Sequence, residues 1–146
     1  MSVVVDANLV AALLVPLPYS ARAEERRSVW NEAEEELVAP TLMEYEVCST
    51  LRKAILGGLL PVERAQDALI RMRELDIRLV PPSVERHARA LEWAERLGRS
   101  RTYDAQYMAL AEELRADFWT AELRLFNRAR QLGISWVHSI LAPPPA

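Results

Sequence analysis

The chain has 146 residues, of which 51% are hydrophobic and 27% charged, and its formal net charge is −3 at pH 7. This length suits one domain with a sizeable core and excludes a second domain, so we expect a single domain over residues 1–141. No apolar run is long enough to cross a bilayer. Because the net charge is negative, nucleic-acid binding would require a local basic patch.

Short runs of β-branched and aromatic residues alternate along the chain with longer helical patterns. The predicted strands are 2–5, 37–39, 78–80, 117–120 and 135–137. The 3.6-residue periodicity of apolar residues predicts helices over 8–14, 21–35, 42–56, 62–75, 84–97, 103–115 and 123–132. Ser83 fits an N-cap of the fifth of these helices. This alternation predicts an α/β fold, with a parallel sheet covered by helices on both faces.

The ends of the chain and its one cysteine carry expectations of their own. The first predicted strand starts at residue 2, so we expect no signal peptide and a cytoplasmic protein. Cys48 excludes an internal disulfide, fits a reducing compartment and lies in an apolar helical stretch, where we expect a buried thiol. Residues 142–146 contain three prolines and no large side chain, and this tail is expected to be disordered or extended.

Asp6 follows the apolar run Val3-Val4-Val5 directly, where a predicted strand passes into a helix. One interpretation is an N-cap for that helix. However, the three valines predict a buried strand, which leaves the carboxylate at the carboxyl edge of the sheet. Open α/β sheets bind their ligands at this edge, so Asp6 is a candidate site residue.

Glu46 is a second candidate, in the predicted helix 42–56. Nearby, Thr41 and Glu44 have the spacing of a capping box, which gives Glu44 a structural function. Glu46 lies in the second turn among apolar neighbours, where an ionised carboxylate is costly without a partner or a cation. Glu46 is therefore the better candidate of the two acids.

Two further acids lie where late helices begin. Asp104 follows Thr102, a predicted N-cap, and its charge complements the helix dipole. Glu122 comes two residues after Thr120, which ends the predicted strand 117–120. Taken alone, each acid is more often structural. If the first strand is central in the sheet, however, the acids Asp6, Glu46, Asp104 and Glu122 surround one crevice at the carboxyl ends of the strands.

Segments around these acids resemble the motifs of a known family. The segments are Val4-Val5-Asp6-Ala7-Asn8, Tyr45-Glu46-Val47 with Leu51 following, Tyr103-Asp104-Ala105 with Ala109-Leu110-Ala111 following, and Trp119-Thr120-Ala121-Glu122. Their order and approximate spacing resemble those of a PIN domain, and the chain is similar to a toxin of the VapC type over almost its whole length. Glu122 is a departure, because the family usually carries aspartate at this position.

The resemblance implies a three-layer α/β/α sandwich with a central, mostly parallel sheet of about five strands. It also implies a ribonuclease that depends on Mg²⁺ or Mn²⁺, a cognate antitoxin that blocks the site, and a homodimer. A catalytically silent PIN-fold binding module is an alternative, because Glu122 departs from the pattern. A PIN nuclease of RNA maturation with no antitoxin is another.

The candidate acids suit this chemistry, because Mg²⁺ takes oxygen ligands in octahedral geometry and keeps several waters. We expect all of them to be catalytic, with Asp6 and Asp104 as the main metal ligands and Glu122 as a further ligand, direct or through water. Glu46 would bind a second ion or orient the attacking water. One metal would activate that water and a second could stabilise the leaving oxygen of the phosphodiester, and the sequence leaves both versions open.

Polar residues next to the acids complete the predicted site. Asn8 and Thr120 are expected to orient the acids through hydrogen bonds, although both are also ordinary residues at a helix entry. Tyr103 is a candidate for stacking an unpaired base, although an aromatic residue beside a helix start more often packs against the core. The expected contacts to RNA phosphates are Arg99, Arg101, Arg124 and Arg128.

Other enzyme classes lack their motifs in this sequence. A phosphatase with an aspartyl nucleophile would need aspartate at position 8, where the chain has Asn8. There is no glycine-rich phosphate loop and no Gly-x-Ser-x-Gly elbow. His87 and His138 have no zinc-site spacing with Cys48, so we expect structural histidines.

Overall fold

The run of valines near the N-terminus forms the central strand of a parallel sheet. β1 (Ser2–Val5) pairs with β2 (Glu36–Pro40) on one side and with β4 (Asp117–Thr120) on the other. β3 (Arg78–Val80) extends the sheet beyond β2, and β5 (Val137–Ser139) extends it beyond β4. The strand order is therefore β3-β2-β1-β4-β5. The computed structural model describes residues 1–143, so residues 144–146 of the predicted tail lie outside the described residues.

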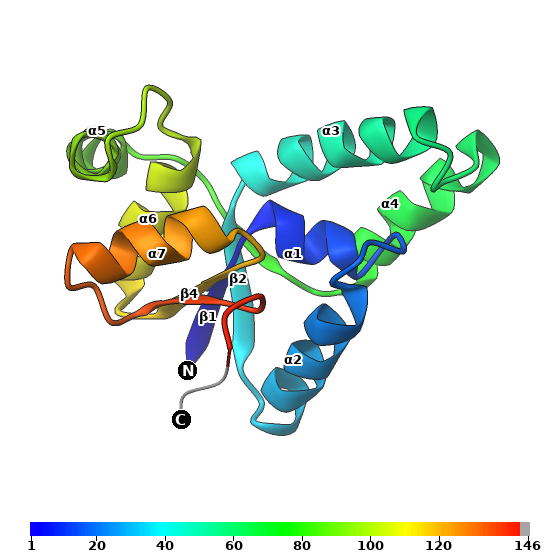
Figure 1. Ribbon diagram of the computed structural model, residues 1–146, viewed down its shortest axis with the longest axis horizontal. Coiled ribbons are helices and arrows are strands. Elements are labelled where there is room, and N and C mark those ends of the chain that lie inside the picture. The colour runs from blue at the N-terminus through cyan, green and yellow to red at the C-terminus, as the bar shows by residue number, and fades with distance from the viewer. Residues whose placement is uncertain (144–146) are drawn as a thin grey trace.

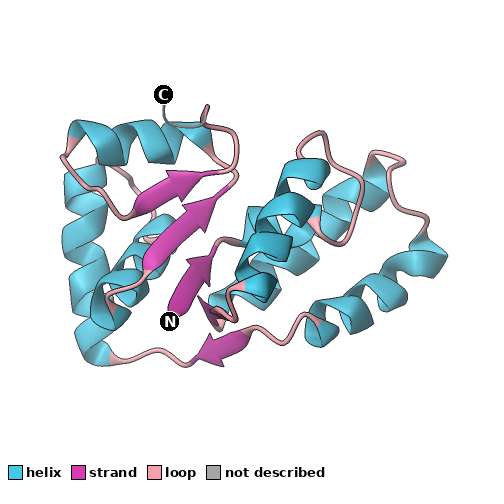
Figure 2. Cartoon of the chain, turned by 90° about the horizontal axis from the view of Figure 1, so that it is seen from below, coloured by secondary structure: helices cyan, strands magenta, loops and turns pink. Residues whose placement is uncertain are grey.

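Helices cover both faces of the sheet. Their bounds are α1 (Ala7–Ala12), α2 (Ser20–Glu32), α3 (Leu42–Leu56), the short 3₁₀ helix η1 (Val62–Arg64), α4 (Ala65–Glu74), α5 (Val84–Leu97), α6 (Tyr103–Leu114) and α7 (Leu123–Gln131). Figures 1 and 2 show α1 to α4 on one side of the strands and α5 to α7 on the other. The predicted three-layer α/β/α sandwich with a five-stranded parallel sheet is confirmed. No helix within residues 1–143 is long and apolar enough to span a membrane.

The core lies on both faces of β1. Val4 and Val5 are fully buried, as is Phe118, which pairs with Val4 in the register of β1 and β4. A strand of a parallel sheet is covered on both faces, so its sequence is a continuous apolar run and does not alternate with polar residues. The first polar residue after this run therefore marks the edge of the sheet.

The predicted position of the last strand is wrong by two residues, because strand 135–137 was expected and β5 is Val137–Ser139. The backbone N–H of Ile134 donates to the carbonyl of Ala129 and closes the end of α7, after Gly133 at φ +75°. Ile134 is buried by this turn. Residues 135 and 136 are therefore still part of the connection, and regular pairing starts later.

Two expectations for α3 are also wrong. Cys48 is exposed, because the buried stripe of the helix runs through Met43, Val47 and Leu51 and the cysteine lies beside it. The predicted capping box is not formed, since Thr41 has helical φ and ψ and makes no side-chain cap hydrogen bond. An N-cap residue needs an extended backbone to turn its side chain onto the helix.

A comparison of Ser83 with Thr41 tests this assignment of the N-caps. Ser83 Oγ accepts a hydrogen bond from Arg86 N at 3.1 Å and caps α5, whereas Thr41 caps nothing. We expect Ser83→Ala to lower the free energy of unfolding by about 1 kcal/mol and Thr41→Ala by clearly less. Urea denaturation of the two variants beside the wild type measures both effects. A loss from Thr41→Ala as large as that from Ser83→Ala would contradict the assignment of the caps.

Candidate active site

The carboxyl ends of β1 and β4 lie side by side, and the chain leaves them toward opposite faces of the sheet. From β1 it passes through α1 and α2, and from β4 it passes through α7 (Figure 1). Asp6 follows β1 and its N–H donates to the carbonyl of Trp119 at 2.9 Å, while Glu122 follows β4. Where the chain leaves two neighbouring strands toward opposite faces, a crevice opens at their carboxyl ends, and open α/β sheets bind ligands there. Both acids therefore start from the edge that the sequence predicted.

The carboxylate of Asp6 is held firmly and is only 4% exposed. Its Oδ1 accepts a hydrogen bond from Ala7 N at 2.8 Å, which caps α1, and its Oδ2 accepts one from Thr120 Oγ1 at 2.8 Å. The capping role and the site position therefore coexist in one residue. A carboxylate has about four acceptor positions, so these two bonds leave room for a cation.

A hydrogen-bond network ties Asp6 to the start of α7. Thr120 Oγ1 accepts from Glu122 N at 3.0 Å and from Asn8 Nδ2 at 3.2 Å. Asn8 Oδ1 accepts from Ala121 N at 2.9 Å. Asn8 and Thr120 thus lie between Asp6 and the start of α7. Their hydrogen bonds fix the positions of Asp6 and of the backbone of Glu122.

Glu46 from α3 meets a buried tyrosine that the sequence analysis missed. Tyr107 donates a hydrogen bond from its hydroxyl to Glu46 Oε1 at 2.8 Å, and its ring stacks on Phe118 with centroids 5.6 Å apart. Burial, and then the charges of Asp6 and Glu46, raise the pKa of Tyr107 well above its ordinary value, so it remains a donor at neutral pH. Its spacing of three residues from Asp104 puts both on one helix face, a signal that could have revealed it.

A single arginine joins the other two acids. Arg99 Nη1 lies 3.4 Å from Asp104 Oδ2, and its Nη2 lies 3.2 Å from Glu122 Oε1. Gly98, at φ +70°, ends α5 and turns the chain into the segment that carries this arginine. Glu122 stands at the N-cap position of α7 but makes no cap hydrogen bond, so its carboxylate is available to Arg99.

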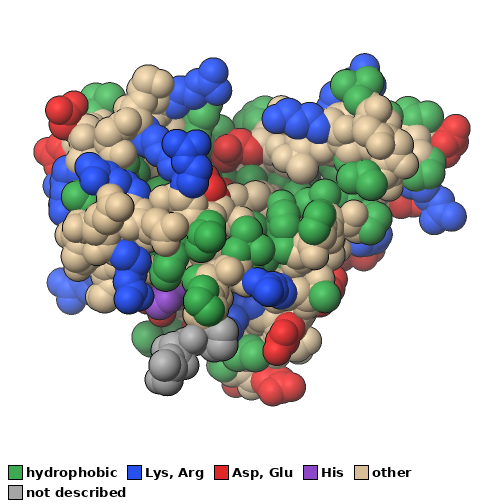
Figure 3. All heavy atoms as spheres, in the orientation of Figure 1, with side chains coloured by type: hydrophobic (Ala, Val, Ile, Leu, Met, Phe, Trp, Pro, Cys, Tyr) green, Lys and Arg blue, Asp and Glu red, His purple; other side chains and the backbone are tan. Residues whose placement is uncertain are grey.

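The other predicted phosphate contacts are more dispersed than Arg99. Arg128 donates to the carbonyl of Arg96 at 3.0 Å, which places it against the end of α5. Arg101 and Arg124 are exposed. Figure 3 shows many Lys and Arg side chains over the half of the face that α5 to α7 occupy in Figure 1, with acidic side chains beside them near the middle. The chain therefore has a local basic region despite its negative net charge.

Burial and mutual repulsion raise the pKa values of three of these acids, Asp6, Glu46 and Asp104. Burial raises the pKa of Asp6 well above its ordinary value, and the charges of Asp104 and Glu46 raise it further, although the hydrogen bond from Thr120 opposes the shift. Burial likewise raises the pKa of Glu46, against the effect of Tyr107. Burial and the charge of Glu122 raise the pKa of Asp104, and Arg99 opposes them. The acids are therefore close enough to repel one another.

Tyr19, which precedes α2, is another residue near the site that no sequence pattern identifies. Burial and the charge of Asp6 raise the pKa of its hydroxyl above the ordinary value. The residue lies in a connection of irregular structure, thirteen positions after Asp6, where no periodicity indicates which way its side chain points.

The donor set suits a hard divalent cation. Within residues 1–143 no group of three or more acidic, histidine or cysteine side chains is gathered closely enough to hold a metal ion as it stands. Mg²⁺ does not need such a cage, because it is bound by one or two carboxylates and keeps several waters. Asp6 and Asp104, whose charges repel each other, provide two carboxylates of this kind.

Comparison with known proteins identifies the family. The PIN domain model matches residues 3–131. This chain belongs to the PIN domain family. Ribonuclease VapC3 of Pyrobaculum aerophilum is 34% identical over 131 residues, which cover 88% of this chain and 95% of that protein. The PIN domain described here is therefore of the VapC type.

Solved structures agree on the fold of this PIN domain. VapBC2 from Rickettsia felis, bound to a DNA fragment from its promoter, matches with a TM-score of 0.68 at 12% identity over 95% of this chain and 98% of that chain. VapC20 from Mycobacterium tuberculosis, a toxin that cleaves the sarcin-ricin loop, matches with a TM-score of 0.63 at 14% identity over 83% and 88% of the two chains. At these identities the similarity establishes the fold alone.

The raised pKa values predict how the stability of the metal-free PIN domain depends on pH. Between the ordinary aspartate pKa of 3.8 and the raised folded-state pKa of Asp6, the folded protein binds more protons than the unfolded chain. The free energy of unfolding contributed by this group therefore decreases as the pH rises through that interval. We expect Asp6→Asn to gain stability relative to the wild type as the pH is raised above 3.8, as measured by chemical denaturation in EDTA at a series of pH values. A difference that stays constant with pH would contradict the burial of a titrating carboxyl.

Proposed function

We propose that this PIN domain is a divalent-metal-dependent endoribonuclease, and that it spans residues 1–141 as a single nuclease domain. The observation that carries the proposal is the set of mutually repelling, partly buried carboxylates at the switch point of the sheet. Buried anions are costly unless a cation compensates them, so such a set indicates a cation site more than a structural feature. The similarity to a VapC ribonuclease supports the same reaction class.

In this proposal Asp6 and Asp104 bind Mg²⁺ or Mn²⁺, and Glu122 is a further ligand, direct or through water. When bound, the metal supplies activation of a water and stabilisation of negative charge at the phosphodiester. Thr120 and Ala7 keep the Asp6 carboxylate in one orientation through their two hydrogen bonds. Tyr107 holds the carboxylate of Glu46, which either orients the attacking water or accepts its proton.

Substrate binding is assigned to the basic region beside the acids. Arg99, Arg101, Arg124 and Arg128 contact RNA phosphates in this proposal, since guanidinium groups bind phosphate oxygens bidentately. Arg99 has a second effect, because in the absence of metal and RNA its charge compensates Asp104 and Glu122. It would exchange these carboxylates for a phosphate when substrate and metal bind.

We further propose that the protein is the toxin of a VapBC-type pair, inhibited by a small antitoxin, and that it forms a homodimer. The similarity to a VapC protein and to the fold of VapBC2 supports the pair. The homodimer is proposed from the family resemblance of the sequence alone. Co-expression with the product of an adjacent small reading frame, followed by purification of one complex, would support the pair. A chain with no such neighbour that still cleaves RNA would favour a nuclease of RNA maturation.

Replacing single acids tests the reaction and the site together. We expect Asp6→Asn and Asp104→Asn each to lower RNA cleavage by roughly 100-fold or more, because each removes a ligand of the metal that would stabilise negative charge at the reacting phosphate. Both variants should also lose Mn²⁺ binding, measured by isothermal titration after EDTA treatment.

Glu44→Gln is the matched control for Glu46→Gln. Both acids lie on α3, but Glu44 forms its ion pair with Arg73. Cleavage should fall in Glu46→Gln and stay near the wild-type rate in Glu44→Gln. Unchanged cleavage by Asp6→Asn would contradict the assignment of the active site. A wild-type protein that binds Mn²⁺ but cleaves no RNA would support the alternative of a catalytically silent binding module.

Arg99 provides a separate test of how cations compete at the site. Because its guanidinium lies between two expected metal ligands, Arg99→Gln should raise the affinity for Mn²⁺ by roughly two- to fivefold, the effect of removing one partly exposed charge. The same variant should raise the KM for RNA. Arg101→Gln is the control for Mn²⁺ binding alone, since Arg101 is exposed and forms no ion pair within the described part of the chain. As another proposed phosphate contact, it should also raise the KM for RNA. Weaker Mn²⁺ binding in Arg99→Gln would show that the arginine supports the metal site instead of competing with it.

A further inference from the structure

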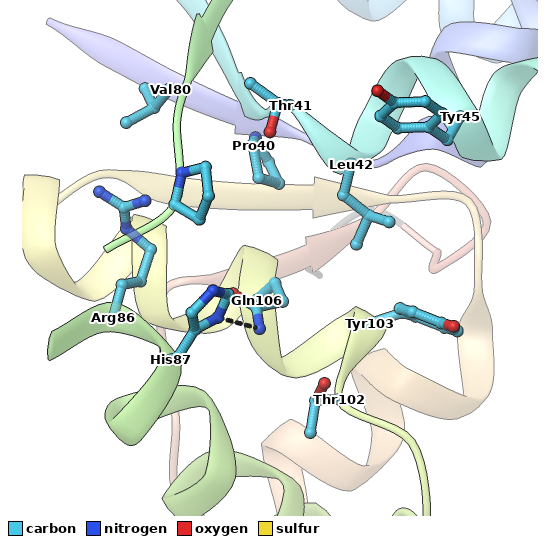
Figure 4. A pocket seen from close by; sticks show the side chains of 11 residues that line it. Pro40, Thr41, Leu42, Tyr45, Val80, Arg86, His87, Thr102, Tyr103 and Gln106 are labelled. Carbon is cyan, nitrogen blue, oxygen red and sulfur yellow. Dashed lines mark hydrogen bonds between the residues drawn. The ribbon is translucent and has the colours of Figure 1, made fainter. Parts of the chain in front are cut away.

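A pocket of about 270 Å³ opens next to the carboxylates, at the ends of β2 and β3. We name it the tyrosine pocket. Pro40 and Val80 end those two strands, and the remaining walls come from the starts of α3 and α6 and from α5 (Figure 4). Tyr45 in its lining immediately precedes Glu46, and Tyr103 immediately precedes Asp104. The pocket therefore adjoins two of the proposed catalytic acids.

The tyrosine pocket has two exposed aromatic rings at its opening. Tyr45 is 74% exposed and Tyr103 is 50% exposed. Figure 4 shows them on facing walls toward the same end of the pocket, with Leu42 between them. Within residues 1–143 neither ring stacks on another aromatic side chain. Aromatic rings exposed beside a small apolar slot are the usual means by which proteins hold an unpaired base.

Away from the two tyrosines, the pocket has a polar edge. Gln106 Nε2 and His87 Nδ1 lie 3.0 Å apart, on α6 and α5, as the dashed line in Figure 4 marks. When the neutral imidazole accepts this hydrogen bond at Nδ1, its Nε2 carries the proton and is a donor, while Gln106 Oε1 is an acceptor. One donor and one acceptor side by side match the edge of a nucleobase.

The pocket presents no net charge to an occupant. Its one arginine, Arg86, is buried and already donates to Glu113 Oε2 at 2.9 Å and to the carbonyl of Pro81 at 2.7 Å. A phosphate or an acidic side chain would therefore gain little here. A neutral, planar group with hydrogen-bonding atoms at one edge suits the lining better.

We propose that the tyrosine pocket binds one unpaired base of the RNA, adjacent to the phosphodiester that is cut, and thereby sets the base preference of cleavage. This inference depends on the proposed ribonuclease function. The volume supports it, because about 270 Å³ is slightly below the roughly 300–1,000 Å³ of pockets for drug-sized ligands. Tyr45 and Tyr103 stack on the faces of the base, and His87 and Gln106 contact its edge.

The test measures binding of RNA separately from cleavage. Four fluorescein-labelled hexanucleotides, of adenosine, cytidine, guanosine or uridine alone, are titrated in EDTA against the protein by fluorescence anisotropy. We expect unequal affinities for the four, and a loss of about fivefold or more for the preferred one in Tyr45→Leu and in Tyr103→Leu. Tyr103→Phe keeps the ring and should retain binding.

Two variants separate base recognition from general effects. Gln106→Leu removes the polar edge and should bring the four affinities closer together while the strongest falls. Leu91→Ala changes an exposed apolar residue of α5 that does not line the pocket, and it should leave all affinities unchanged. Circular dichroism of each variant confirms that it is folded.

The results test base binding by the pocket separately from the proposed nuclease activity. Equal affinities for all four hexanucleotides, no detectable binding of any of them, or wild-type affinities in both tyrosine variants would overturn the inference. Tyrosine variants that still bind RNA but no longer bind a co-expressed antitoxin would also overturn it, because the occupant would then be a peptide. If the hexanucleotides bind as expected but RNA is not cleaved, the pocket stands and the proposed activity fails.

Discussion

The burial of β1 on both faces is the constraint on which the site depends. Val4 and Val5 are fully covered, so the first polar side chain at the carboxyl edge of the sheet is that of the next residue, Asp6. Its carboxylate is still almost wholly buried, and Ala7, Thr120 and, through Thr120, Asn8 hold it there. An acid in such surroundings lowers stability unless it is compensated, because burial penalises its charged form. The same desolvation makes any bound cation interact more strongly with it.

Compensation in the metal-free protein is uneven across the crevice. Arg99 lies against Asp104 and Glu122 on the side of α5 to α7, while Glu46 has a neutral donor in Tyr107 and Asp6 has only neutral donors. The half of the crevice nearest β1 and α3 is therefore the more strongly charged. This asymmetry adds to the effect of burial, which is the largest cause of the raised pKa of Asp6, because no cation opposes the shift there as Arg99 does at Asp104. It also indicates where a cation would stabilise the fold most.

The sequence predicted the elements well where local patterns determine them. The valine run before Asp6, the periodic helices and the Ser83 cap depend on neighbours within a few residues, and the structure agrees with them. Cys48 and the last strand were misplaced because a residue's exposure or pairing depends on which stripe of a helix, or which turn, meets the sheet. The contacts of Tyr107 with Glu46 and of Arg99 with Glu122 join residues 61 and 23 positions apart. No local pattern determines such pairs.

The helices α3 and α6 each carry an acid and an exposed tyrosine at consecutive positions. Consecutive residues on a helix point about 100° apart, so a side chain aimed into the crevice places its predecessor on the adjoining surface. Glu46 and Asp104 face the crevice, and Tyr45 and Tyr103 consequently line the neighbouring pocket. Neither helix can rotate to move the acid without moving the tyrosine as well. The two proposed tasks, cutting a phosphodiester and holding a base beside it, are thus tied together by helix geometry.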